Sequence, residues 1–305
     1  MRTNKLTQRM SSNVRQEYRG EISSAADMMR YLETIQELPT LSAVAMRVNG
    51  MLQDMNTTAR ELSEVIEKDQ SMVSKLLRLA NSSFFGFSSR VSNVAHAVMI
   101  LGFNSVLNAV LSMAVMDALA LPKNKQNKID MTAFWQHSIS VAVVSRHLRQ
   151  ASGGHRHENA FTAGIIHDIG KVVMARYFPE RFGRVCQAME AGKSSFQEAE
   201  KNHFPMGHGA VGAFLVRCWN LPDDLSAVVA QHHQPEIMSQ ANDLVLVVHA
   251  ADAIVNRHLE NREPSEGWPL CNTAKTLLGE QIDAVEQWLP SATEEIQAAC
   301  QAILE

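Results

Sequence analysis

Apolar residues recur at helical spacing along most of the chain from residue 23 onward. One such stripe consists of Leu41, Val44, Ala45, Val48 and Leu52. Residues spaced in this way lie on one face of an α-helix, which is the face that packs against a core. No segment alternates convincingly between apolar and polar residues, as a half-buried strand would. The pattern therefore predicts an all-α protein.

Local motifs mark where several of these helices begin and end. Three pairs with the spacing of a capping box precede apolar helical segments: Thr58 and Glu61, Ser195 and Glu198, Ser291 and Glu294. The last pair predicts the start of the final helix. Gly102 separates two apolar helical segments, 91–101 and 103–119. Further helices are expected at 131–150 and 158–169.

Polar segments divide the chain into four parts. Residues 1–22 carry five positive and two negative charges and predict a flexible tail, which is favoured over a nucleic-acid-binding arm. The polar, basic segment 121–128 is the clearest boundary. We therefore expect an N-terminal helical subdomain at 23–121 and a second helical subdomain at 129–260. Residues 261–305 form a loop followed by helices that pack on the second subdomain.

Composition narrows the function classes. The net charge is −4 and the pI is about 6.3, which gives no general attraction to nucleic acids or anionic membranes. The four cysteines form no Cys-x-x-Cys pair and are expected to be reduced thiols. No apolar run approaches the roughly 18–20 residues that span a bilayer, and no signal peptide is evident. We therefore expect a cytoplasmic protein.

The segment 163–171 carries the most informative chemistry. An apolar approach leads to the adjacent residues His167 and Asp168, which are followed by Gly170 and Lys171. Imidazole and carboxylate together suit Zn, Fe, Mn, Co or Ni better than Ca or Mg. Gly170 can adopt the positive φ that ends a helix, which would place His167 and Asp168 in the last helical turn. A buried His hydrogen-bonded to its neighbouring Asp is the alternative explanation of this segment.

Other donors in the second half favour a metal site. The candidate ligands are His137, His167, Asp168, His208, His232, His233 and Asp252. They lie on separate predicted helices or helix ends, and a helical bundle can direct such side chains into one interior pocket. The set exceeds the needs of one ion, so a site with two divalent transition metals (Fe, Mn, Ni or Zn) is expected. Lys171 could meet a phosphate oxygen beside it.

The order of these residues resembles that of the HD superfamily of metal-dependent phosphohydrolases. An isolated His137, the pair His167-Asp168 and a distant Asp252 match the superfamily pattern in sequence order. His208 and the pair His232-His233 also resemble the HD-GYP branch, which is linked to cyclic dinucleotide hydrolysis at a two- or three-metal centre. In this chain Gln234-Pro235-Glu236-Ile237-Met238 stands where that branch has its Gly-Tyr-Pro signature.

Motifs in the first half resemble the HDOD domain. They are Leu38-Pro39-Thr40-Leu41, Ile66-Glu67-Lys68-Asp69-Gln70, Leu76-Leu77-Arg78-Leu79-Ala80-Asn81-Ser82 and Ala97-Val98-Met99-Ile100-Leu101-Gly102. The resemblance covers about residues 25–260 and implies a helical N-terminal half joined to an HD-like half. HDOD proteins are bacterial signalling proteins, often regarded as regulatory modules without catalysis. Many have degenerate metal positions, whereas each HD-type position identified here retains a ligand residue.

Two functions follow from the resemblance. The first is a regulatory signalling module that binds a protein partner, a nucleotide or a cyclic dinucleotide. The second is a metal-dependent phosphohydrolase or phosphodiesterase, in which Asp168 would bridge two metals and Lys171 would neutralise phosphate charge. The absence of an obvious separate acid for the leaving group favours the first. The substrate, the metal, the upstream signal and a homo-oligomeric state are left open by the sequence.

Overall fold

A computed structural model describes residues 22–52, 54, 56–86, 90–121, 129–151, 159–192, 195–237, 242–260 and 270–305. Over these residues the chain is helical and contains no strand, which confirms the predicted all-α class. The predicted tail at 1–22, except its last residue, and the predicted boundary segment after Leu121 lie outside the described residues. The division into subdomains stays a prediction.

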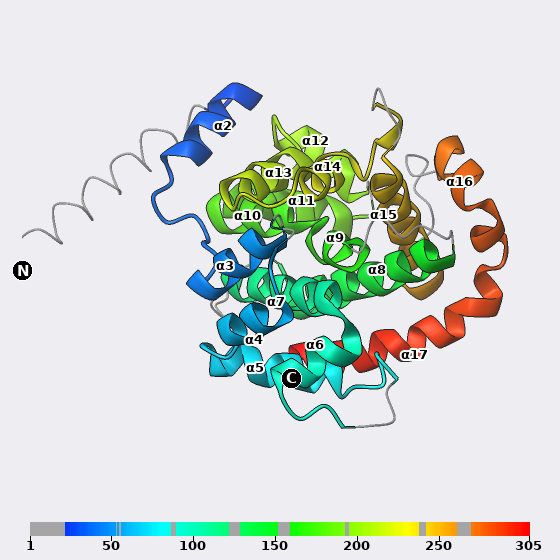
Figure 1. Cartoon of the computed structure of the whole chain (residues 1–305). Helices are drawn as coiled ribbons and strands as arrows, with labels where there is room; N and C mark the ends of the chain where they lie inside the picture. Colours follow the sequence, from blue (N-terminus) through cyan, green and yellow to red (C-terminus); the bar gives the residue numbers. More distant parts are fainter. Residues whose placement is uncertain are drawn as a thin grey trace, which may run out of the picture.

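The described residues of the first half form six helices (Figure 1). They are α2 (Ala25–Thr34), α3 (Ala43–Leu52), α4 (Ala59–Ile66), α5 (Gln70–Ala80), α6 (Val94–Leu101) and α7 (Phe103–Ala118). The predicted capping box of Thr58 and Glu61 is present at the start of α4. Gly102 separates α6 from α7 with a φ of 87°, a conformation that costs glycine little because it lacks a Cβ.

The remaining chain contributes the longer series of helices. They are α8 (Met131–Ala151), α9 (Ala160–Ile166), α10 (Ile169–Tyr177), α11 (Pro179–Glu190), α12 (Phe196–His203), α13 (His208–Cys218), α14 (Asp223–Gln231), the 3₁₀ helix η1 (Pro235–Ile237), α15 (Asp243–Ile254), the π-helix η2 (Val255–Leu259), α16 (Asn272–Asp283) and α17 (Val285–Leu304). The capping box of Ser195 and Glu198 is confirmed at α12. The one predicted at Ser291 is wrong, since α17 begins at Val285 and continues through Pro290.

Helices α7, α8 and α9 run through the middle of the molecule (Figure 1). Every residue from Val106 to Met116 of α7 is buried, as are most of α8 and all of α9. Helix α9 packs between α7 and α8, while α17 crosses back to contact both α8 and α5. One hydrophobic core therefore includes residues from both halves of the chain.

Polar contacts also join the two halves. Thr162 of α9 contacts Asn108 and Ser112 of α7 through buried hydrogen bonds of 3.0–3.2 Å. The indole N–H of Trp219 donates to the carbonyl oxygen of Pro39 at 2.7 Å. The helix that ends just before His167 is thus anchored directly to the N-terminal half.

None of the described helices is by itself long and apolar enough to cross a membrane. Helices α6 and α7 satisfy the length and hydropathy criteria only as a pair, and they are bent by 119° at the break between them. Their buried faces belong to the protein core described above.

Candidate metal centre

The His-Asp pair lies in a turn between two helices. Helix α9 ends at Ile166, and α10 begins at Ile169, so His167 and Asp168 occupy the break. The prediction that Gly170 ends a helix with positive φ is wrong, because Gly170 lies inside α10 and its φ is not positive. A Cβ on Gly170 would lie 1.9 Å from the carbonyl oxygen of His208. Glycine is therefore required here for close packing of α10 against α13.

All seven predicted ligands converge on this break. They come from the middle of α8 (His137), the turn itself (His167, Asp168), the first residue of α13 (His208), the end of α14 (His232, His233) and α15 (Asp252). Their ligand atoms form three overlapping sets, each with all atoms within 4.8 Å of one another. The side chains of His167, Asp168 and Asp252 are at most 3% exposed. Separate elements thus deliver the donors to one interior point.

Asp168 stands between two groups of histidines. Its Oδ1 lies 3.1 Å from Nε2 of His208 and 3.5 Å from Nε2 of His232. Its Oδ2 lies 3.4 Å from Nε2 of His167 and 4.0 Å from Nε2 of His137. The two carboxylate oxygens therefore face different donor groups, as a carboxylate between two cations would.

Hydrogen bonds at Nδ1 fix the orientation of the imidazole rings. Nδ1–H of His167 donates to the carbonyl oxygen of Gly164 at 2.7 Å. Nδ1–H of His232 donates to the carbonyl oxygens of Val228 and Val229 at 3.2 and 3.1 Å. A carbonyl cannot donate a proton, so Nδ1 must carry the hydrogen in each ring. In the neutral rings Nε2 is then a free lone pair directed at Asp168.

Two glutamates that the sequence analysis did not identify orient further histidines. Glu200 of α12 accepts from the backbone N–H and from Nδ1 of His208, at 2.6 and 3.0 Å. Glu260 accepts from Nδ1 of His137 at 2.7 Å. Carboxylates commonly hold metal-binding histidines in this way, fixing the tautomer and raising the basicity of Nε2. In the sequence, Glu200 is marked only by its position eight residues before His208. That spacing is too weak a signal to identify it.

His249 of α15 supports the centre from outside. Its Nδ1 donates to the carbonyl oxygen of His232 at 2.7 Å, and its Nε2 accepts from the backbone N–H of Cys271 at 3.2 Å. Both ring nitrogens are therefore engaged. His249 positions the backbone at His232 and is not itself a ligand.

The arrangement fits a bound cation. Nε2 of His167 and Oδ1 of Asp168 are buried and make no hydrogen bond within the described residues. Nε2 of His208 faces Nε2 of both His232 and His233, at 3.5 and 3.0 Å. Lone pairs pointing at one another without enough protons between them are unfavourable in a buried site. A divalent metal would satisfy these acceptors together, and nitrogen and carboxylate donors suit transition metals.

The carboxylates around His137 and His208 shift the pKa values of these two rings upward. Burial acts to lower the pKa of His137, but hydrogen bonds with Asp252 and Glu260 raise it to about 9. Burial acts in the same way on His208, and Glu200 and Asp168 raise its pKa to about 9. Protons on these two rings therefore supply positive charge beside the carboxylates. A metal ion would take over that role when it displaces the Nε2 protons.

The pKa values of two other groups, His232 and Asp168, are lowered. Burial lowers the pKa of His232 to about 4, and the positive charge of His208 opposes its protonation further. Burial acts to raise the pKa of Asp168, but the positive charge of Lys171 holds the pKa of that carboxyl well below its usual value. The centre thus contains an ionised carboxylate beside a neutral imidazole, which are the forms that bind metal.

Lys171 lies at the edge of the centre. Its Nζ forms an ion pair with Oδ2 of Asp168 and lies 4.6 Å from the centre of the Phe196 ring. Its side chain is 19% exposed, so it is the part of the cluster that combines positive charge with access to solvent. The predicted position beside the donors is therefore observed, although in this state Lys171 neutralises Asp168.

Residues 38–235 match the HDOD domain family. This chain belongs to the HDOD domain family. The match covers most of the first half and the helices that carry six of the seven donors, while Asp252 lies beyond it. The sequence-based assignment is thereby confirmed.

Solved structures of similar proteins share the HDOD fold. An HDOD domain protein of unknown function from Geobacter sulfurreducens is 23% identical, with a TM-score of 0.78 over 90% of this chain and 96% of its own. A protein of Shewanella amazonensis, provisionally named a phosphohydrolase, is 22% identical, with a TM-score of 0.74 over 93% and 100%. A protein of Marinobacter aquaeolei, provisionally named a signal transduction protein, is 22% identical, with a TM-score of 0.73 over 98% and 66%. At these identities the likeness establishes the fold.

The curated relative that matches this chain is itself uncharacterised, so it suggests no activity. An uncharacterised protein of Treponema pallidum is 22% identical over 280 residues, which are 88% of this chain and 52% of that protein. The chain thus spans about half the length of the curated relative it matches.

Proposed function

We propose that this protein is a signalling module of the HDOD type whose conformation depends on divalent transition metals bound at the centre around Asp168. The observation that carries the proposal is the convergence of buried histidine Nε2 atoms on both oxygens of one carboxylate. Such a cluster is costly to bury without a cation. Its retention in a family where many metal positions are degenerate supports a metal-dependent role.

Two ions match the donor set better than one. His137, His167 and Asp252 would hold one ion, and His208, His232 and His233 the other, with Asp168 shared between them. Fe, Mn, Ni and Zn suit this mixture of imidazole and carboxylate. Bound there, the ions would supply Lewis acidity and concentrated positive charge. The chain's own part is to fix the rings through Glu200, Glu260 and the backbone carbonyls.

The regulatory role rests on the burial and the connections of the centre. His167, His208 and His232 are at most 1% exposed, so the ligands lie largely away from substrate. Helix α9 leads directly into the His167-Asp168 turn and is bonded to α7 through Thr162. Ordering of the turn by metal would therefore reach the N-terminal half. A protein partner or a nucleotide bound at the surface of the N-terminal half would respond to the change.

A second function is supported by Lys171 and the complete donor set. In a metal-dependent phosphohydrolase acting on a nucleotide or cyclic dinucleotide, a cation beside the metals would bind the phosphate, and Lys171 is 19% exposed at that position. In this mechanism Asp168 would hold the metals in position, and Lys171 would bind a phosphate oxygen. Gln234 and Pro235, in place of the Gly-Tyr-Pro signature, favour the regulatory function over cyclic dinucleotide hydrolysis.

Hydrogen exchange with and without added Mn²⁺ or Zn²⁺ tests the regulatory proposal. Metal is expected to increase amide protection in α9 and also in α7, because Thr162 and Asn108 join these helices. Asp168→Ala should abolish both effects. Protection confined to the ligands, with α7 unchanged, would contradict transmission to the N-terminal half. Metal-dependent release of a linear product from a cyclic dinucleotide, lost in Asp168→Ala and Lys171→Met, would establish the second function instead.

A further inference from the structure

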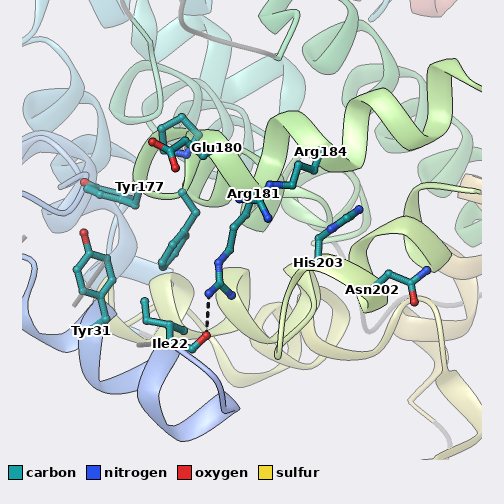
Figure 2. Close-up of a pocket in the computed structure, with 10 residues that line it drawn as sticks. Ile22, Tyr31, Tyr177, Glu180, Arg181, Arg184, Asn202 and His203 are labelled. Carbon is teal, nitrogen blue, oxygen red and sulfur yellow. Dashed lines mark hydrogen bonds between the residues drawn. The ribbon is translucent and has the colours of Figure 1, made fainter. Parts of the chain in front are cut away.

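A second feature of the structure is a cavity of about 420 Å³ (Figure 2). Its lining residues are Ile22, Tyr31, Tyr177, Phe178, Pro179, Glu180, Arg181, Arg184, Asn202 and His203. They come from the chain before α2, from α2, and from α10, α11 and α12. None of them is a candidate metal ligand. The volume lies within the range of small-molecule sites, which is about 300–1,000 Å³.

Positive groups predominate in the lining. The guanidinium groups of Arg181 and Arg184 and the imidazole of His203 line the cavity together with a single carboxylate, that of Glu180. One guanidinium nitrogen of Arg181 donates to the carbonyl oxygen of Ile22 at 2.8 Å, which holds the side chain across the cavity (Figure 2). The side chains of Arg184 and His203 make no hydrogen bond or ion pair with any described residue. Their donors are available to a ligand.

The start of α11 adds to this positive character. The residue before it, Phe178, provides no side-chain cap, and its first residue, Pro179, has no N–H. The backbone N–H groups of Glu180 and Arg181 therefore have no acceptor among the described residues outside their helix. Free N–H groups at a helix start attract anions, particularly phosphate.

Aromatic rings form the other side of the cavity. Figure 2 shows Tyr31 and Tyr177 on one side, with His203 and Asn202 on the opposite side and Arg181 between them. The ring of Phe178 lies 5.3 Å from that of Tyr31, so the rings form a packed apolar wall. Tyr177 is held in place by a hydrogen bond from its hydroxyl to the carbonyl oxygen of Glu37 at 2.6 Å. Such a wall favours a flat ring.

We infer that this cavity binds a small organic phosphate with an aromatic ring, of the nucleoside monophosphate type. The ring lies against Tyr31 and Tyr177, and the phosphate lies between Arg184, His203 and the start of α11. Arginine and free backbone N–H groups are established phosphate donors in proteins. The site shares helix α12 with Glu200 but shares no residue with the metal centre. It is therefore an additional ligand site, separate from the proposed function.

Equilibrium dialysis of the full chain against GMP tests the inference. Saturable binding is expected for the wild-type protein, and it should persist in EDTA because no metal takes part. The double substitution Arg184→Gln with His203→Gln should weaken binding at least tenfold. Both residues are at least partly exposed, so the fold is expected to survive. Arg78→Gln, at an exposed arginine on the last turn of α5, is the matched control and should leave binding unchanged.

Three results would overturn the inference. Loss of GMP binding in EDTA would place the nucleotide at the metal centre. Equal affinity of the wild-type and doubly substituted proteins would remove the phosphate site. Inorganic phosphate that binds as tightly as GMP would show that the aromatic wall contributes nothing. None of these outcomes depends on whether the metal centre is catalytic or regulatory.

Discussion

Helix α7 and the metal centre bury polar groups in contrasting ways. The buried stretch of α7 includes two polar residues, Asn108 and Ser112, which are uncharged and hydrogen-bonded to Thr162. The metal centre buries ionised Asp168 together with several histidines whose Nε2 atoms face one another. The first region satisfies its polar groups with its own atoms. The second needs protons or a cation from outside.

This difference predicts where stability comes from. Burial of the uncharged side chains that fill a core stabilises the fold without any ion, by roughly 25 cal/mol per Å² of apolar surface. A buried cluster of carboxylates and lone pairs is stable only when its charges are compensated. Ligand binding to the folded state then adds stability in proportion to the logarithm of ligand concentration. Added metal should therefore alter the stability effect of substitutions at the centre around Asp168, but not that of substitutions in the core of α7.

The largest effect is expected from Gly170→Ala. The new Cβ would lie 1.9 Å from the carbonyl oxygen of His208, so the backbones of α10 and α13 must separate. We expect a loss of about 3 kcal/mol or more in the free energy of unfolding, together with weaker metal binding. Gly279→Ala in α16 is the control, since its Cβ would meet nothing within 4 Å, and it should stabilise by up to about 1 kcal/mol. Urea denaturation measures both, and equal effects would contradict the close packing.

The second-largest effect is expected from removal of the metal. Chelation with EDTA should lower the free energy of unfolding by about 2.7 kcal/mol if free metal stood at 100 times its Kd. The same treatment should leave Asp168→Ala unchanged, because that variant lacks the shared carboxylate. Denaturation curves with and without EDTA provide the measurement. A wild-type curve that is insensitive to EDTA after metal loading would mean that the cluster is satisfied by protons alone.

Glu200→Gln should have a moderate effect confined to the metal centre. The substitution keeps the shape of the side chain but removes the charge that orients His208 through Nδ1. We expect metal affinity to fall about 10–100-fold. Glu198→Gln on the same helix is the matched control, because Glu198 caps α12 and does not touch a histidine. Competition with a fluorescent chelator would report both affinities, and equal values would exclude a positioning role for Glu200.

The smallest effect is expected in the N-terminal half. Thr58→Ala removes the side-chain acceptor for the backbone N–H of Glu61 at the start of α4. The loss should be about 1 kcal/mol in the free energy of unfolding, with no change in metal content. Thr57→Ala, one residue before the cap, should cost less. A change of metal affinity in Thr58→Ala would show that the two regions are coupled more strongly than proposed.

The helices were largely predictable because their signals are local. Apolar spacing and capping boxes identified α4, α8 and α12 close to their observed starts. The predicted start at Ser291 failed because Pro290 is accommodated within α17, where tertiary contacts outweigh one lost backbone hydrogen bond. Local sequence signals cannot weigh such contacts.

The candidate metal donors could be selected from the sequence by residue type and order, whereas the residues that support them could not. His167 and Asp168 stand out because they are adjacent and match a known order. Glu200 and Glu260 depend on where α12 and η2 meet the histidines in space, which no spacing in the sequence encodes. The prediction that Gly170 ends a helix failed for the same reason, because its close contact with His208 arises only in the folded protein.

The metal content of gently purified protein, measured by elemental analysis beside Asp168→Ala, tests the central claim most directly. The account predicts about two Fe, Mn, Ni or Zn ions per chain in the wild-type protein and loss of both in the variant, because Asp168 faces both donor groups. A wild-type protein that contains no metal and takes up none when it is added would contradict the account.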